Sequence, residues 1–135
     1  MPAPKPQKAS TFRLSKIVGF TITTQPEKAK AFYTKTLGFP FVKDDGFALV
    51  FDAHGTMLRV SKLKQFTPAQ FTVLGWEVED IEAAVAELVR RGVVFERYPG
   101  MPQDKSGICT FPGEARVAWF KDPDGNVLSV SQHNK

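Results

Sequence analysis

Apolar and polar residues alternate with period two along residues 17–24, IVGFTITT, and this pattern predicts a strand. The apolar positions then follow a helical period through residues 25–37, and Gly38 ends the predicted helix. Thr24 and Glu27 fit a capping box at the start of this helix. Turn sequences then separate three short predicted strands near residues 39–43, 47–52 and 56–62.

The same order of elements returns in the second half of the chain. Residues 71–79 predict a strand, Asp80 is placed to cap the helix that follows, and Gly92 ends that helix. Further strands are predicted at residues 93–98, 116–121 and 126–132. This repeated pattern predicts an α+β fold built from two tandem β-α-β-β-β modules.

The modules set the expected domain organisation. Module one covers about residues 16–63 and module two about 70–132, within a single domain over residues 12–135. Residues 1–11, MPAPKPQKAST, contain three prolines and two lysines and little that is apolar. We expect this segment to be a disordered leader.

Alternation along the strands also predicts which residues face the helices. The apolar set expected in the core includes Phe20, Ile22, Leu74, Trp76, Leu128 and Val130. The polar set expected on the opposite face is Thr21, Thr23, Arg59, Ser61, Glu77, Ser129 and Ser131. A polar sheet face is either simply hydrated or lines a concave binding surface. Because polar residues recur on this face in four strands, we favour a concave binding surface.

The stretch AWFKDPDGNVLSVSQ, residues 118–132, predicts a strand, a tight turn and a second strand. Asp122, Pro123 and Gly125 occupy the first, second and fourth positions that a type I turn favours. This turn is expected to reverse the chain between the last two strands.

Composition and charge narrow the range of functions. The formal net charge is +4, and no basic cluster is interleaved with aromatic residues, so we expect no nucleic-acid partner. No apolar run approaches the ~18 residues that a membrane helix needs, and no signal peptide is evident, so we expect no membrane partner. Cys109 is the single cysteine. A cytoplasmic location fits a chain that cannot form an internal disulfide.

Three stretches together resemble the vicinal oxygen chelate superfamily, namely KAFYTKTLGF, WEVEDIEAAVAELVRRGVVFE and AWFKDPDGNVLSVSQ. That superfamily includes glyoxalases, bleomycin-resistance proteins, fosfomycin-resistance enzymes and extradiol dioxygenases. The resemblance extends over about residues 16–132. It implies a cupped, half-barrel-like eight-stranded sheet with helices on the convex side, and a homodimer.

The resemblance also implies where a metal would be bound. Metalloenzymes of this superfamily take ligands, typically His and Glu, from the first and last strands of each module. Those places fall here on Gly19, or Val18 if the helix starts are aligned, and on Arg59, Val73 and Ser129. A catalytic metal needs about three His, Cys, Asp or Glu donors, and Arg59 would repel a cation. We therefore expect no metal and no other cofactor.

Without a metal, Arg59 is expected to orient a carboxylate or phosphate of a small-molecule ligand. Glu77 is expected either to accept a hydrogen bond from the ligand or act as a base, or simply to neutralise Arg59. The long connection over residues 98–115 would either provide an apolar lid over the cup through Tyr98, Met101 and Phe111 or simply pack on itself. The expected ligand-binding residues are Thr21, Arg59, Ser61, Glu77, Ser129, Tyr98, Met101 and Phe111.

Four functions fit these residues. The first is a metal-free binding protein for a small, partly apolar, anionic molecule. The second is a metal-independent enzyme with Glu77 as its acid or base. The third is a metal-dependent lyase or dioxygenase whose ligands lie elsewhere. The fourth is a protein–protein interaction module with a vestigial cup.

Overall fold

The computed structural model describes residues 11–113 and 115–133, so the predicted leader lies almost entirely outside the described residues. The first sheet contains β1 (Val18–Thr23), β2 (Phe41–Asp44), β3 (Ala48–Ala53) and β4 (Thr56–Lys62). Its strand order is β1-β4-β3-β2, with β1 parallel to β4 and the other pairs antiparallel.

The second sheet repeats this topology. It contains β5 (Thr72–Glu77), β6 (Cys109–Thr110), β7 (Ala115–Lys121) and β8 (Val127–His133). Its strand order is β5-β8-β7-β6, again with one parallel pair, β5 and β8. The predicted α+β fold of two modules is therefore confirmed, with each module contributing its own four-stranded sheet.

Each module carries one helical segment between its first two strands. In module one, α1 (Pro26–Ala31) continues into a π-helical turn, η1 (Phe32–Thr36). In module two, α2 (Ile81–Arg90) begins at Asp80, whose carboxylate accepts a hydrogen bond from the backbone N–H of Ala83 at 3.1 Å, as predicted. In the described part of the chain, no helix has the length and apolar character to cross a membrane.

The predicted capping box of α1 is wrong. The residue before the helix is Gln25, whose side chain makes no capping hydrogen bond within the described chain. Thr24 instead donates both its backbone N–H and its hydroxyl to Asp124 of module two, at 2.8 and 2.9 Å. Asp124, which is distant in the sequence, therefore binds the Thr24 hydroxyl that a local cap would use.

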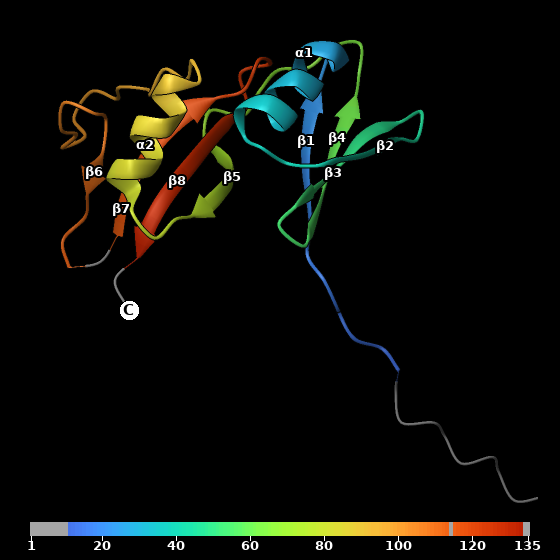
Figure 1. The fold of residues 1–135 in the computed structure, drawn as a ribbon, viewed down its shortest axis with the longest axis horizontal. Coiled ribbons are helices and arrows are strands. Elements are labelled where there is room, and N and C mark those ends of the chain that lie inside the picture. Colours follow the sequence, from blue (N-terminus) through green and yellow to red (C-terminus); the bar gives the residue numbers. More distant parts are fainter. Residues whose placement is uncertain (1–10, 114, 134–135) are drawn as a thin grey trace, which may run out of the picture.

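The two sheets meet along their edge strands β1 and β5, and both helices cover the same face of the pair (Figure 1). Gly19 of β1 lies so close to Leu74 of β5 that a Cβ there would be 3.3 Å from the Leu74 side chain. One hydrophobic core extends over both modules. Phe32 of η1 reaches Phe120 of β7, with ring centroids 6.4 Å apart. The face opposite the helices is hereafter the open face.

Residues 93–98 do not form the strand that the sequence predicts; the short strand β6 lies later, at Cys109–Thr110. A single backbone hydrogen bond joins Glu96 to Trp119 of β7. The side-chain amide of Gln103 takes the place of a strand partner. It donates to the carbonyl of Glu96 and accepts from the N–H of Tyr98, both at 2.8 Å. A side chain thus replaces part of the expected strand pairing.

The predicted orientation of β1 is also wrong. Phe20 is 58% exposed, whereas Thr21 and Thr23 are buried beneath the helices. Strand pairing places Phe20 beside Arg59 and Ile22 beside Ser61 on the open face. Strands β5 and β8 keep the predicted orientation, with Leu128 and Val130 buried and paired to Leu74 and Trp76 of β5.

Candidate functional site

A pocket of about 410 Å³ lies on the open face where the linker of residues 63–71 passes from β4 to β5. We call it the linker pocket. It is lined by Phe20, Thr21, Ile22, Ser61, Phe66, Thr67, Ala69, Val73 and Asn126. Its volume suits a small organic ligand. The apolar side chains would cover the body of such a ligand, and the Ser61 hydroxyl offers both a donor and an acceptor.

Arg59 lies on β4, two positions before Ser61, and pairs with Asp45 rather than with Glu77. One guanidinium nitrogen lies 2.6 Å from the Asp45 carboxylate. This carboxylate also accepts the backbone N–H groups of Phe47 and Ala48. The hydrogen bond from Arg59, followed by those two backbone bonds, holds the pKa of Asp45 well below its usual range. Asp45 therefore stays charged and fixes the Arg59 side chain on the open face.

Thr21, which we expected on the binding face, instead points towards the helices. Its hydroxyl donates a long hydrogen bond of 3.4 Å to the Tyr33 oxygen, because the single Tyr33 proton goes to Asp122, and its side chain is buried. Two unpredicted residues of β1, Phe20 and Ile22, occupy the open face in its place.

Glu77 lies on the open face of β5, paired with Ser131 of β8. It lines a separate pocket of about 410 Å³ with Val78, Glu79, Gln132 and His133. It does not belong to the lining of the linker pocket. The structure therefore places Ser61 in the pocket and Arg59 on the adjacent strand surface, and places Glu77 elsewhere.

Ser129 and Tyr98 belong to the open face of module two. Ser129 is buried and pairs with Trp119 of β7, and the ring of Tyr98 packs edge-on against Trp119 at 5.5 Å. Desolvation raises the pKa of Tyr98, with a further contribution from the charge of Glu96. Of the other lid residues, Met101 is half-buried beside Tyr98 and Phe111 is 38% exposed. None of these residues lines the linker pocket.

The chemistry of the expected metal-ligand places does not suit a divalent metal. Gly19 points towards the helix side, so Val18 occupies the open face of β1. Arg59 carries a positive charge, and Val73 offers no donor atom. Within residues 11–113 and 115–133, no three His, Cys, Asp or Glu side chains come close enough together to hold a metal ion. The donors that such a site requires are not found among these residues.

A buried polar network lies beside the linker pocket. The Tyr33 hydroxyl donates to the Asp122 carboxylate at 2.7 Å, and the Asn126 amide donates to Asp122 and to the carbonyl of Ile22. Thr23 donates to Asp124 at 2.5 Å. This network holds the predicted turn, which the Gly125 N–H closes onto the Asp122 carbonyl at 3.0 Å. The turn therefore binds module two to module one and supports the back of the pocket.

Most of the lining of the linker pocket was not predicted as site residues, including its large apolar side chains Phe20, Ile22 and Phe66. Phe20 and Ile22 looked like core residues because they alternate with threonines. Phe66 lies in a linker with no predicted element. The one signal in the sequence is that this linker contains two aromatic residues, Phe66 and Phe71, where polar residues are usual.

Comparisons with known proteins agree with this fold. The model of the glyoxalase/bleomycin resistance protein/dioxygenase superfamily matches residues 16–130. No curated protein sequence matches the chain.

Three solved structures illustrate the similarity. The antibiotic-binding protein TnmS3 from Streptomyces sp. CB03234 is 27% identical, with a TM-score of 0.63, over 91% of this chain and 100% of that one. A superfamily member from Sphaerobacter thermophilus DSM 20745 is also 27% identical, with a TM-score of 0.67, over 89% and 99% of the two chains. A glyoxalase/bleomycin resistance protein/dioxygenase from Nocardioides shares the fold at 17% identity, with a TM-score of 0.68, over 93% and 87%.

Proposed function

Because the chain belongs to the glyoxalase/bleomycin resistance protein/dioxygenase superfamily, we propose that it binds a small, partly apolar, anionic molecule in the linker pocket without a metal. The observation that carries this proposal is the chemistry of the open face. Apolar side chains line the pocket, and the places at which metalloenzymes of this superfamily hold their ligands contain Val18, Arg59, Val73 and Ser129.

The similarity to TnmS3 supports a binding role. TnmS3 is an antibiotic-binding protein, and the alignment covers its whole length at 27% identity. The apolar lining of the linker pocket suits an organic molecule that contains rings or alkyl groups. We therefore propose a ligand of this general kind for the present chain.

Arg59 supports the anionic part of the proposal. Its ion pair with Asp45 uses one guanidinium nitrogen and leaves further N–H donors for a ligand carboxylate or phosphate. Asp45 lies beside the same cation and would repel that anion. Replacing Asp45 with asparagine should therefore strengthen the binding of an anionic ligand, whereas replacing Arg59 with alanine should weaken it.

The test uses a panel of aromatic carboxylates and their uncharged amides, with binding measured by titration calorimetry. We expect the native protein to prefer the carboxylates. Arg59→Ala should lose this preference, by about tenfold or more in Kd, since a hydrogen bond to a charged group is worth ~1.5–3 kcal/mol. Arg116→Ala is the matched control, because Arg116 is also a half-exposed arginine in an ion pair, with Glu82 at 2.8 Å.

If Arg59→Ala and Arg116→Ala changed the preference for carboxylates equally, Arg59 would not be a ligand-binding residue. If Ile22→Asp left the affinity unchanged, the linker pocket would not be the binding site. Ile22 is half-buried and lies in the lining.

Metal content is a separate prediction. After dialysis, the purified untagged protein should contain well below one equivalent of any transition metal by elemental mass spectrometry, because the expected ligand places lack donors. About one equivalent of tightly held metal would overturn this part of the proposal and favour a lyase or dioxygenase of the glyoxalase type.

The hypothesis of an enzyme that uses Glu77 stays a prediction. It requires a turnover that varies with pH and is lost on substitution of Glu77 by glutamine. A turnover unaffected by that substitution would count against it. We also propose a homodimer in the cytoplasm, and sedimentation of the purified protein measures the first of these directly.

A further inference from the structure

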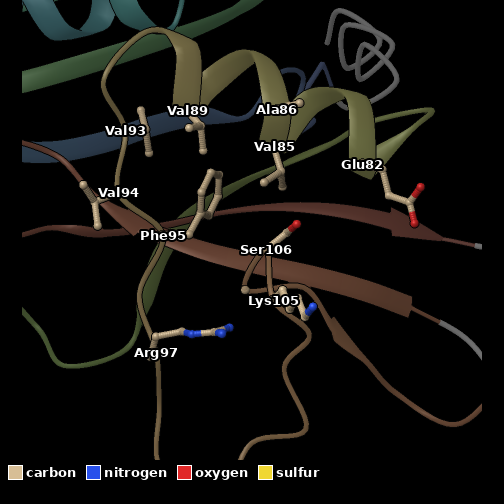
Figure 2. A pocket seen from close by; sticks show the side chains of 11 residues that line it. Glu82, Val85, Ala86, Val89, Val93, Val94, Phe95, Arg97, Lys105 and Ser106 are labelled. Carbon is tan, nitrogen blue, oxygen red and sulfur yellow. The ribbon is translucent and has the colours of Figure 1, made fainter.

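A second and larger groove, of about 540 Å³, lies beside α2 in module two (Figure 2) and shares no lining residue with the linker pocket. We call it the α2 groove. Its residues come from α2, from the segment that follows this helix, and from the loop before β6. They are Glu82, Val85, Ala86, Val89, Val93, Val94, Phe95, Arg97, Lys105, Ser106 and Gly107.

The loop that forms one wall of the groove is held in place by hydrogen bonds. Gln103 donates to the carbonyls of Glu96 and Gly107, at 2.8 and 2.9 Å. The Asp104 carboxylate accepts the N–H groups of Ser106 and Ile108, at 2.8 and 3.0 Å. Gly107 has φ of 91°, and a Cβ there would lie 3.2 Å from the Phe95 Cβ. The wall is therefore preformed, which lowers the cost of ordering it around a ligand.

The floor and upper wall of the groove are apolar. Val94 is 77% exposed and Val89 is 54% exposed, and both line the groove together with Phe95. Figure 2 shows the Phe95 ring directed towards Val89 and Val85 of α2. The same ring packs on Phe120 of the core at 5.5 Å, so its position is fixed. Exposed valines beside a fixed aromatic ring form an apolar surface that a ligand would bury.

The anionic and cationic side chains of the groove differ in whether they have an ion-pair partner. Glu82, at one end, is neutralised by Arg116 at 2.8 Å. Arg97 and Lys105 lie together at the side away from α2 (Figure 2). Arg97 donates to the backbone carbonyl of Asp104. Within the described chain, neither cation has a carboxylate at ion-pair distance.

We propose that the α2 groove is a second binding site, for a small amphiphilic anion whose apolar part lies along Val89, Val94 and Phe95. Its carboxylate or sulfonate then pairs with Lys105 and Arg97. Two cations without an ion-pair partner among the described residues, beside an exposed apolar surface, match this chemistry in both parts. The site is independent of the linker pocket and of the function proposed for it.

The test is a titration of the full-length ¹⁵N-labelled protein with sodium decanoate below its micelle concentration, followed by NMR. We expect saturable shifts of the amides of Val89, Val94 and Lys105. Decan-1-ol, which has the same chain length and no charge, should bind at least about tenfold more weakly, since it forgoes charge-assisted hydrogen bonds worth ~1.5–3 kcal/mol.

Two variants and their controls locate the site. Lys105→Glu should weaken decanoate binding about tenfold or more, because it reverses a charge beside the carboxylate. Val94→Asp should do the same through the apolar surface. Lys28→Glu and Val42→Asp are the matched controls, since both residues are exposed and lie in module one. The Arg59→Ala variant should bind decanoate normally, which separates this site from the linker pocket.

Three outcomes would overturn the proposal. The first is a set of shifts that never saturates, or that is confined to residues of the linker pocket. The second is equal binding of decanoate and decan-1-ol. The third is an equal effect of Lys105→Glu and Lys28→Glu. Lys105→Glu and Lys28→Glu both change exposed side chains, so we expect both variants to fold. The NMR spectrum of each variant verifies this.

Discussion

Thr21 and Thr23 occupy the helix side of β1 because each finds a polar partner there. Thr21 donates a hydrogen bond to the Tyr33 oxygen, and Thr23 donates to Asp124. With both hydroxyls satisfied, burial of these residues avoids the cost of an unpaired polar group. Phe20 and Ile22 then fall on the open face, where they supply the apolar part of the linker pocket.

Two substitutions in β1 should have effects opposite to those that hydrophobicity suggests. Thr23→Val removes the donor to Asp124 in a buried setting and should cost about 1–3 kcal/mol of unfolding free energy. Phe20→Ser should cost about 1 kcal/mol or less, because more than half of the phenylalanine is already exposed. Urea unfolding of the two variants measures the difference. A larger loss for Phe20→Ser would contradict this account of the strand.

At the scale of elements, the segment of residues 93–98 depends on a side chain rather than on a strand partner. Gln103 makes three hydrogen bonds, to the backbones of Glu96, Tyr98 and Gly107. These bonds connect the segment to the loop before β6. The same residue therefore supports both the α2 groove and the position of Tyr98 over Trp119.

Gln103→Ala should loosen this part of module two. The substitution leaves backbone groups at three residues without their partners, so we expect a loss of about 1–3 kcal/mol. The exchange of the Tyr98 amide hydrogen should also become faster, as hydrogen-exchange mass spectrometry would show. Gln65→Ala, in the exposed linker, is the control and should be nearly neutral. Unchanged exchange at Tyr98 would show that Gln103 does not hold the segment.

At the scale of the whole molecule, the turn of residues 122–126 is the main polar connection between the modules. Asp124 accepts hydrogen bonds from Thr23 and Thr24 of module one. Burial alone would raise the pKa of Asp124, but these bonds outweigh it, and the pKa is lowered. Desolvation raises the pKa of Asp122, so the two carboxylates contribute to the pH dependence of stability with opposite signs.

The lowered pKa of Asp124 gives a pH dependence of known sign. Its contribution to stability is present above its unfolded value of 3.8 and is lost as pH falls through the lower folded value. Asp124→Asn should therefore be clearly less stable than the native protein at neutral pH, and the difference should shrink as pH falls below 3.8. Urea unfolding at several pH values measures this. A difference that stays constant with pH would rule out an ionised Asp124 as the cause.

Local signals in the sequence were enough to predict much of this fold. The order of elements, the Asp80 cap and the turn at Gly125 all depend on residues close in sequence. The resemblance to the superfamily was likewise confirmed by the match over residues 16–130. The predicted placing of Arg59 and Ser61 on the open face agrees with the strand pairing.

The remaining features depend on partners far along the chain. Thr23 and Asp124 are 101 positions apart, so their hydrogen bond cannot be inferred from the local alternation that predicted the faces of β1. The role of Gln103 is similar, because nothing in its neighbourhood shows that its amide replaces a strand. The apolar lining from Phe20 and Phe66 was missed for the same reason, since it appears only once β1 and the linker are brought together.

The bonds between Asp124 and the threonines of β1 also determine what each half of the chain can do alone. A cut within the linker of residues 63–71 would give two fragments, each missing buried polar partners supplied by the other. Neither fragment should fold by itself, and mixing the two should restore a single cooperative unfolding transition. The molecule would then serve as a split reporter, in which recovery of the fold signals that two fused proteins have met.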